Sequence, residues 1–547
     1  MAATAFIPPA PAGPASAPGA PPNRLYVVRT ALIVALGGFL MGFDASVISG
    51  VVKFIEPEFG LTKLEVGWAV SSLTLTATLA MMFSGPLSDR YGRRTLLFAA
   101  AVVFAFSAAA SALAPSFWFF VVARMIGGFG VGAALVIAPM YIAEISPAAI
   151  RGQMVSFNQL NIVLGITAAF FTNYLILQLA DSPAGWAQSL GLAEHPWRWM
   201  LGVGTLPAVL YFVGLFFVPL SPRWLLMKGR DAEALPIMRM AVGNVAALQE
   251  LSDIQKSMAA EENKGTGTLR DLFARSMWLV LTIGVVVGIL QQITGINSVF
   301  FYAPTIFEQS GIGTDAAFVQ AILVGVINVV FTLAAIALID RLGRKPLLVI
   351  GLVGITASML VLAYGFGQAT YTLPPSATAV VAEQADALAP LVGQTFTSDV
   401  AFKGALQQAL GPEAATAYEA PLLTEAITMN PTLILLGILG FVASFAMSLG
   451  PVMWVLFSEL FPTRVRGLAI SFVGLINSAV SFLVQLVFPW QLASLGSATT
   501  FLIYGVFAAV GLVFVLLVVP ETKGKSLEEL EAQLVRAPGA VTPMRPV

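Results

Sequence analysis

The sequence consists mostly of long apolar runs, each long enough to cross a lipid bilayer. A helix needs about 20 apolar residues to span the hydrocarbon core. Runs of this kind lie near 30–52, 66–87, 95–113, 117–143, 154–180, 197–218, 277–305, 316–339, 346–367, 431–457, 467–490 and 499–519. The 547 residues are 58% hydrophobic and only 10% charged, far from the balance of a soluble domain. Because a span in lipid must satisfy its backbone hydrogen bonds internally, the sequence predicts an all-α membrane protein with twelve transmembrane helices.

Two motifs occur twice, in the same order and direction, so the chain contains a duplicated half. Asp89-Arg90-Tyr91-Gly92-Arg93-Arg94 returns as Asp340-Arg341-Leu342-Gly343-Arg344-Lys345, and the spaced set Glu144, Pro147, Arg151, Gly152 returns as Glu459, Pro462, Arg466, Gly467. Parallel repeats of this kind are typical of secondary transporters. The first motif recurs after 251 residues and the second after 315. The second half therefore contains an insertion, and the weakly apolar stretch 368–430 is the place for it.

These observations predict a domain organisation. We expect two parallel six-helix bundles, over 25–220 and 276–519, joined by short cytoplasmic helices over 221–275. The Ala-, Pro- and Gly-rich segment 1–24 is expected to be a disordered tail, and 520–547 a cytoplasmic tail. Lys and Arg gather in alternate loops, which places those loops and both termini in the cytoplasm. The insertion, with six acidic residues and a single Lys403, suits the external side.

Composition also excludes several classes of function. A net charge of −1 offers no basic stripe for nucleic acid, and the absence of cysteine excludes thiol catalysis and disulfides. The single histidine, His195, is expected to be a solvated loop residue rather than a catalytic group. We therefore expect no enzyme activity, no cofactor and no metal site.

Further motifs accompany the repeats in a fixed order. They are Gly42-Phe43-Asp44, Arg124-x-x-Gly127-Gly128, Pro139-x-Tyr141, Ser221-Pro222-Arg223, Gln291-Gln292-x-x-Gly295-Ile296-Asn297, Gly450-Pro451-x-x-Trp454 and Pro520-Glu521-Thr522-Lys523-Gly524. Together with the repeated loops they resemble the sugar porters of the major facilitator superfamily, over roughly Leu32 to Leu530. That family includes bacterial xylose and glucose proton symporters and facilitative glucose transporters.

The resemblance implies proton-coupled symport of a hexose or pentose, such as glucose or xylose, by alternating access. An uncoupled sugar uniporter is one alternative. A proton-coupled myo-inositol or polyol transporter is another, because members of that branch have a long external loop between spans nine and ten. Here that segment has no cysteine, so the disulfide-stapled version of the loop is excluded. A sugar-sensing receptor is the least expected, because a long signalling tail would be needed.

A sugar site needs neutral donors and acceptors for several hydroxyl groups and an apolar wall for the ring. Gln291, Gln292 and Asn297 provide amides in one span, and Gly295 would let the helix break so that all three point inward. Asn328 and Asn477 are amides in other spans, although such residues can also simply join helices. The resemblance adds Gln159 as a sugar contact and Trp454 as the apolar wall.

Asp44 is the most costly residue in the sequence, because an ionised carboxylate in mid-span costs about 3 kcal/mol on insertion scales. Arg124, in the middle of the fourth run, is the expected partner. Family symporters have an acid at this position, whereas facilitative glucose transporters have asparagine, so the resemblance implies that Asp44 and Arg124 couple transport to a proton. The alternative is a permanent structural ion pair.

The resemblance also implies two gates. Tyr302, in a breakable helix segment, is expected to be the external gate, with ordinary aromatic packing as the alternative. The cytoplasmic gate is expected to consist of charged residues from both halves, namely Asp89, Arg93, Arg94, Glu144 and Arg151 with Asp340, Arg344, Glu459, Arg464 and Arg466. The expected partners are a small-molecule sugar, the proton and the lipid bilayer of the plasma or inner membrane. We expect a functional monomer.

Overall fold

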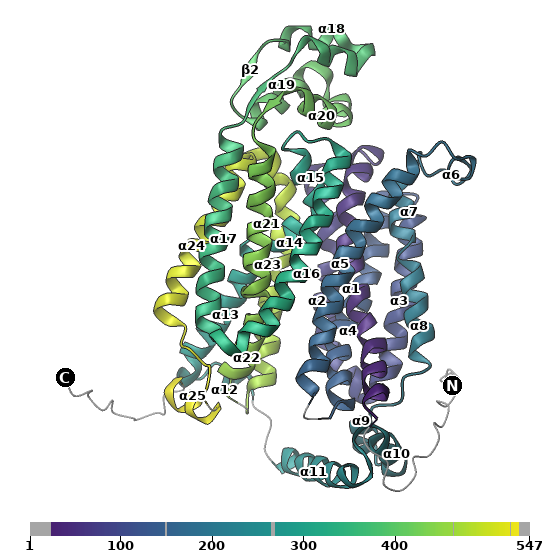
Figure 1. Ribbon diagram of the computed structural model, residues 1–547, viewed down its shortest axis with the longest axis vertical. Coiled ribbons are helices and arrows are strands. Elements are labelled where there is room, and N and C mark those ends of the chain that lie inside the picture. The colour runs from purple at the N-terminus through teal and green to yellow at the C-terminus, as the bar shows by residue number, and fades with distance from the viewer. Residues whose placement is uncertain (1–22, 148–149, 264–267, 463, 526, 535–547) are drawn as a thin grey trace, which may run out of the picture. The chain divides into compact units, whose positions relative to one another are not determined.

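The structure is a computed structural model that describes residues 23–147, 150–263, 268–462, 464–525 and 527–534 (Figure 1). Within these residues twelve helical segments are long and apolar enough to cross a membrane, which confirms the predicted fold class. The tail predicted over 1–24 lies outside the described residues as far as residue 22. Half of the predicted C-terminal tail 520–547 also lies outside them, and helix α25 (Leu527–Leu534) belongs to the described half.

Nine of these spans are single helices. They are α1 (Arg24–Glu58), α2 (Lys63–Tyr91), α3 (Arg93–Ala112), α4 (Phe117–Ile145), α5 (Arg151–Ala180), α16 (Thr314–Leu342), α17 (Arg344–Gly367), α23 (Arg466–Leu495) and α24 (Ser497–Val518). Helix α6 (Gly185–Ser189) is a short helix outside the spans. Because most of these helices are longer than their apolar runs, their ends extend beyond the expected hydrocarbon core.

The other three spans are broken. One consists of α7 (Pro196–Gly202) and α8 (Thr205–Leu215), and another of α21 (Pro431–Met447) and α22 (Leu449–Leu460). The third consists of the 3₁₀ turn η1 (Arg275–Met277), α13 (Trp278–Ile293) and α14 (Ile296–Phe301), followed by α15 (Ala303–Glu308). The break between α21 and α22 lies at Ser448, shortly before the Gly450-Pro451 pair of the sequence motif. Pro451 explains the position, because a proline ring clashes with the carbonyl four residues earlier, which here is Met447.

Contacts divide the described chain into two units. The first contains 1–47, 75–169 and 197–265, and the second contains 48–74, 170–196 and 266–547. The change from the first unit to the second near residue 265 falls inside the predicted linker. However, the C-terminal part of α1, the start of α2 and the end of α5 belong to the second unit, so the units are not identical to the two sequence repeats. The bundle boundaries 25–220 and 276–519 stay a prediction.

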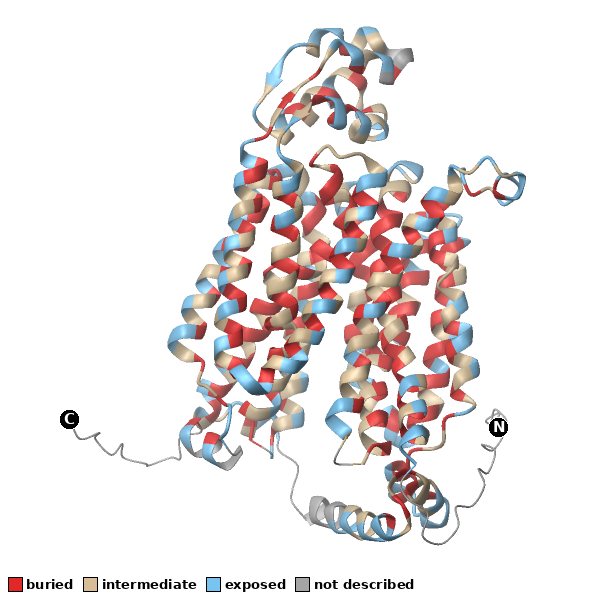
Figure 2. Cartoon of the chain, viewed as in Figure 1, coloured by how far each residue is buried: buried red, intermediate tan, exposed pale blue. Residues whose placement is uncertain are grey.

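Burial within the helices fits a membrane environment. Each helix has buried positions on the face that contacts other helices, shown in red in Figure 2. Large apolar side chains remain exposed on the spans, including Phe83 (60%), Leu210 (60%) and Leu517 (79%). Exposed apolar side chains in this number would make a soluble protein aggregate, whereas lipid chains solvate them.

The linker contains the four short helices α9 (Pro222–Met227), α10 (Asp231–Val242), α11 (Asn244–Asn263) and α12 (Leu269–Leu272). Trp224, Leu226, Ala234, Met238 and Ala247 form a small core within α9, α10 and α11. Helices are therefore present in this segment, and three of them pack on one another.

The 368–430 insertion is a folded subdomain. It has three short strands, β1 (Thr370–Thr372), β2 (Thr395–Phe396) and β3 (Ile427–Thr428), in the antiparallel order β2-β1-β3. Its helices are η2 (Pro375–Gln384), α18 (Ala385–Leu388), η3 (Ala389–Leu391), α19 (Asp399–Leu410) and α20 (Pro412–Ala426). Tyr371, Leu373, Phe402 and Leu422 are at most 2% exposed and belong to one core. The subdomain follows α17 and precedes α21 (Figure 1).

Candidate functional site

Asp44 of α1 and Arg124 of α4 form a buried ion pair in the first unit. Nη1 of Arg124 donates to Oδ1 of Asp44 at 2.8 Å and to the Asp44 carbonyl oxygen at 2.9 Å. The side chain of Arg124 is 1% exposed and that of Asp44 14%. Gly127, one turn after Arg124, permits this approach, because a Cβ there would lie 2.4 Å from Ser107 Oγ and 3.3 Å from Asp44 Oδ2.

The pair does not use all of its hydrogen-bonding atoms. Among the described residues, Oδ2 of Asp44 and both Nε and Nη2 of Arg124 have no hydrogen-bond partner. A cavity of about 10 Å³ touches Asp44 and is otherwise lined by apolar residues, including Phe43, Phe104 and Leu201. Such a volume is close to the minimum that one water molecule needs. Buried polar atoms without partners are costly, so this pair is incompletely compensated.

Four of the predicted sugar-binding amides lie together in the second unit. Asn297 Nδ2 donates to Gln292 Oε1 at 2.9 Å, and Gln292 Nε2 donates to Gln291 Oε1 and to Asn477 Oδ1, both at 3.2 Å. Asn477 Nδ2 donates to Gln291 Oε1 at 2.8 Å. Gln291, Gln292 and Asn477 are at most 9% exposed. The four side chains therefore form one hydrogen-bonded network, which we call the amide network.

The backbone break at Gly295 makes this network possible. Gly295 has φ +87°, a left-handed conformation that favours glycine, and it separates α13, with Gln291 and Gln292, from α14, with Asn297. A Cβ at Gly295 would also lie 2.6 Å from the Tyr504 ring. The predicted broken helix is therefore present at the predicted residue.

The amide network continues onto two residues that the sequence analysis missed. Ser481 Oγ accepts hydrogen bonds from Asn297 Nδ2 and Gln485 Nε2, both at 2.8 Å. Ser481 and Gln485 follow Asn477 at intervals of four residues along α23, so the three lie on one face of the helix. Polar residues repeated at this spacing in an apolar span were the signal that could have found them.

Tyr302 lies at the junction between α14 and α15. Its ring is 1% exposed and lies 5.2 Å from the ring of Phe488, and its hydroxyl donates to the Gln485 carbonyl at 3.3 Å. The residue thus sits at a helix break and contacts the helix that holds part of the amide network. Whether it moves as a gate stays a prediction.

The three remaining predicted sugar contacts lie apart from this network. Asn328 is 5% exposed on α16, and Trp454 is 45% exposed on α22, edge-on to Phe457. Gln159 belongs to α5 in the first unit and is exposed. The hydrogen bonds described for the amide network do not involve these three residues, and their roles stay predictions.

The repeated loop motifs have the same internal geometry in each unit. Arg93 pairs with Asp89 at 2.7 Å and Glu144 at 3.0 Å, and Arg344 pairs with Asp340 at 3.1 Å and Glu459 at 2.7 Å. Each arginine also donates through Nη1 to the carbonyl five residues earlier, at 3.1 Å in both cases. Ser221 donates to Glu144 and Thr522 donates to Glu459, which extends the correspondence to the end of each half.

The other charged residues predicted for the cytoplasmic gate have different partners. Arg94 donates to the Leu215 and Phe216 carbonyls, and Arg466 donates to the Phe461 carbonyl. Arg151 lies 3.8 Å from Glu250, and Arg464 lies 3.2 Å from Asp271. Hydrogen bonds from Thr268 lower the pKa of Asp271, so this acid is ionised beside Arg464. Each of these pairs lies within a single unit. A gate formed between the two halves stays a prediction.

Comparison with known proteins fits this geometry. The family described as "Sugar (and other) transporter" matches residues 30–382 and 413–534. The D-xylose-proton symporter of Escherichia coli K12 is 35% identical over 544 residues, covering 93% of this chain and 96% of that protein. The arabinose-proton symporter of Bacillus subtilis is 34% identical over 506 residues, covering 92% of this chain and 94% of that protein.

A solved structure agrees with these relatives. The xylose transporter of E. coli in an inward-open conformation has a TM-score of 0.71 and 32% identity to this chain. The match covers 93% of this chain and 100% of the chain in that structure. The family match spans most of the sequence, and the relatives are transporters rather than enzymes. This chain therefore belongs to the sugar porter family of the major facilitator superfamily.

Proposed function

We propose that this protein is a secondary active transporter that carries a monosaccharide, a pentose or hexose such as xylose or glucose, together with a proton by alternating access. The observation that carries the proposal is the buried Asp44–Arg124 pair with its unpartnered polar atoms. Two relatives that cover most of this chain have names that describe proton-coupled uptake of xylose and arabinose. A pair of this kind on a sugar porter fold favours symport over uncoupled transport.

The proton step would act through the charge of Asp44. Adding a proton to Oδ2 neutralises the carboxyl, and a neutral carboxyl no longer compensates the buried guanidinium of Arg124. The two protonation states therefore differ in their preference for the conformations of the transport cycle. Asp44 lies three residues before the point, between Val47 and Ile48, at which α1 changes from the first unit to the second. A change at this residue is well placed to affect how α1 packs.

The sugar step would act through the amide network. The amides of Gln291, Gln292, Asn297 and Asn477 bind one another in the described structure, and each can exchange an amide partner for a sugar hydroxyl. Such exchange keeps the buried groups satisfied with and without substrate, which a site that alternates between empty and filled needs. Tyr302, at the adjoining break, would close the site from outside.

The remaining assignments follow from the sequence. Lys and Arg in alternate loops support a plasma or inner membrane protein with both termini in the cytoplasm. The charged residues of the two repeated motifs would form the cytoplasmic gate, exchanging the pairs within each unit for pairs across the halves during the cycle. We propose a functional unit of one chain in contact with the lipid bilayer.

The energetics make coupling worthwhile. A proton moving down about 100 mV releases about 2.3 kcal/mol, and about 1.4 kcal/mol corresponds to a tenfold ratio. One proton can thus sustain a sugar gradient of about 50-fold.

In sealed vesicles with an imposed pH gradient, the protein should accumulate labelled xylose or glucose against its gradient, and a protonophore should abolish this accumulation. Equilibration without concentration at any pH gradient would show an uncoupled uniporter instead.

A further inference from the structure

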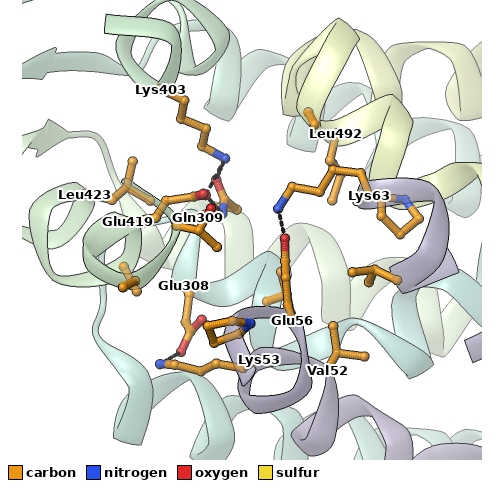
Figure 3. Close-up of a pocket in the computed structure, with 18 of the residues that line it drawn as sticks. Val52, Lys53, Glu56, Lys63, Glu308, Gln309, Lys403, Glu419, Leu423 and Leu492 are labelled. Carbon is orange, nitrogen blue, oxygen red and sulfur yellow. Dashed lines mark hydrogen bonds and ion pairs between the residues drawn. The ribbon is translucent and has the colours of Figure 1, made fainter. Parts of the chain in front are cut away.

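A second cavity lies in the second unit, and many of its lining residues are charged or polar. It does not include Asp44 or Arg124. Its volume is about 430 Å³, within the range of small-molecule sites. Residues from the C-terminal part of α1, the start of α2, α15 and the insertion helices α19 and α20 line it. Figure 3 shows the charged side chains of these elements around the cavity.

Three lysine–glutamate pairs surround the cavity, so its net charge is zero. Lys53 pairs with Glu308, Lys63 with Glu56, and Lys403 with Glu419 (Figure 3). Gln309 joins the third pair, accepting from Lys403 at 2.6 Å and donating to Glu419 at 3.3 Å. An equal number of both charges suits a neutral ligand better than an anion or a cation.

These pairs keep hydrogen-bonding capacity for a ligand. Among the described residues, the side-chain hydrogen bonds and ion pairs of Glu56, Glu308 and Glu419 all involve Oε1. The second carboxylate oxygen of each can accept from a hydroxyl group, and each ammonium has three donors. Burial alone would raise the pKa of Glu419, but Lys403 and Lys63 lower it to about 2, so this acceptor is ionised throughout the physiological range.

The cavity also has an apolar wall. Phe54, Pro57, Val66, Pro421 and Leu423 contribute to its lining. Adjacent donors, acceptors and an apolar surface match a molecule with hydroxyl groups on its edges and C–H groups on its ring faces. A neutral monosaccharide has this chemistry, and a lipid chain or an inorganic ion does not.

The insertion also contacts segments next to the cavity, namely the start of α24 and the turn after α15. Asp399 of α19 accepts from the backbone N–H of Ser497 at the start of α24, at 2.9 Å. Gly311, with φ +79°, lets Ile427 of β3 approach, because a Cβ there would lie 2.1 Å from Ile427 Cγ2. With its own core and these contacts, the insertion is a fixed wall of the cavity and not a loose loop.

Tyr302 connects the cavity to the candidate sugar site. It lines the cavity, and its hydroxyl donates to the backbone carbonyl of Gln485. The side chain of the same residue bonds Ser481 and so extends the amide network. We propose that this cavity is a vestibular binding site for a neutral monosaccharide on the external side of Tyr302, completed by the 368–430 insertion. The proposal rests on the proposed function, which makes this solute the substrate and this side external.

The absence of cysteine gives a direct test. Gln407 lines the cavity from α19 and is exposed, so Gln407→Cys would place a single thiol in the proposed site. Thr397→Cys, at an exposed position of the same insertion outside the cavity lining, is the matched control. In proteoliposomes, D-xylose or D-glucose should slow the reaction of a membrane-impermeant maleimide with the first thiol and leave the second unchanged.

A further variant separates this site from the amide network. In an Asn297→Ala background, which should lose transport, the sugar should still protect Gln407→Cys. Protection that disappears with Asn297→Ala would overturn the proposal, because it would then reflect a conformational change driven from the amide network. If the parent protein transports sugar but no sugar protects the thiol, the vestibular site is wrong while the proposed function stands. If the parent transports no sugar, the proposed function itself fails.

Kinetics give a second, directional readout. Glu419→Gln should raise the KM for sugar entry from the outside roughly tenfold, the loss expected for one charged hydrogen bond. The kcat of entry and the KM of efflux should not change, whereas the kcat of efflux should fall by the same factor, because the overall equilibrium ties the kcat/KM values of the two directions. Glu425→Gln, an exposed acid on the same helix α20, should leave all of these constants unchanged. An equal rise of the KM in both directions would contradict a site on the outer side.

Discussion

At the residue scale, the Asp44–Arg124 pair lies inside the first unit with only part of its hydrogen-bonding capacity used. Arg124 is 1% exposed, and two of its nitrogens and one Asp44 oxygen have no partner among the described residues. A permanent structural pair would be expected to satisfy these atoms, because buried ion pairs repay desolvation only when they are fully hydrogen-bonded. The incomplete pairing therefore favours a group that changes its protonation state.

Replacing the carboxyl separates coupling from transport. Asp44→Asn keeps the side-chain shape but removes the charge, so the protein should behave as if permanently protonated. We expect counterflow exchange of labelled sugar to continue in proteoliposomes, while accumulation driven by a pH gradient falls to equilibration. Accumulation at the wild-type level would assign the proton site to another residue.

The amide network can be tested through Ser481. Ser481→Ala removes the oxygen that accepts from Asn297 and Gln485, so one N–H of each amide loses this acceptor, at a cost of about 1–3 kcal/mol for the buried Gln485 amide. The KM for sugar should rise about tenfold or more. Ser458→Ala is the control, because Ser458 is an exposed serine on α22 whose hydroxyl bonds only locally, to the Val455 carbonyl. Similar KM values for the two variants would remove Ser481 from the site.

At the element scale, broken helices position the candidate site. The break at Gly295 aims the amides of α13 and α14 at each other, and the break at Tyr302 follows one short helix later. Helix breaks in a membrane leave backbone groups that protein, not lipid, must satisfy. Polar side chains therefore gather where the seventh span is interrupted.

A pair of glycine variants tests this break. Gly295 and Gly313 both have positive φ, +87° and +78°, but only at Gly295 would a Cβ meet a side chain, Tyr504, at 2.6 Å. Both alanine variants should lose about 1–3 kcal/mol from backbone strain, because Gly295 is left-handed and Gly313, with ψ 164°, has a conformation open almost only to glycine. Gly295→Ala should lose more, through the clash, and should also lose sugar binding. Thermal unfolding and binding measurements would check this, and equal effects would contradict the role of the break.

At the scale of the whole molecule, the two repeats carry matching arginine–glutamate pairs of unequal burial. The side chains of Arg93 and Glu144 are 4% and 7% exposed, whereas those of Arg344 and Glu459 are 11% and 21% exposed. Removing one partner of a buried pair costs about 3–5 kcal/mol because a charge is left uncompensated. Arg93→Met should therefore destabilise the protein more than Arg344→Met in thermal unfolding. The reverse order would show that burial does not set the loss of stability at these two pairs.

The sequence allowed the fold and much of the site to be predicted, for identifiable reasons. Spans follow from apolar length, and the repeats follow from motifs such as those around Arg93 and Arg344. The pairing of Asp44 with Arg124 could be inferred because a mid-span charge requires a partner. Ser481 and Gln485 were missed because single hydroxyls and amides in spans are common. The fold of the insertion was missed because its strands of two or three residues are too short for a periodic signal.

The central claim is that sugar and proton move together, and it can be measured without any imposed gradient of protons. When xylose or glucose is added outside de-energised, weakly buffered proteoliposomes, the external medium should become alkaline as protons enter with the sugar. The Asp44→Asn variant should give no such signal. Sugar entry by the wild-type protein with no change in external pH, for every solute tested, would contradict the account.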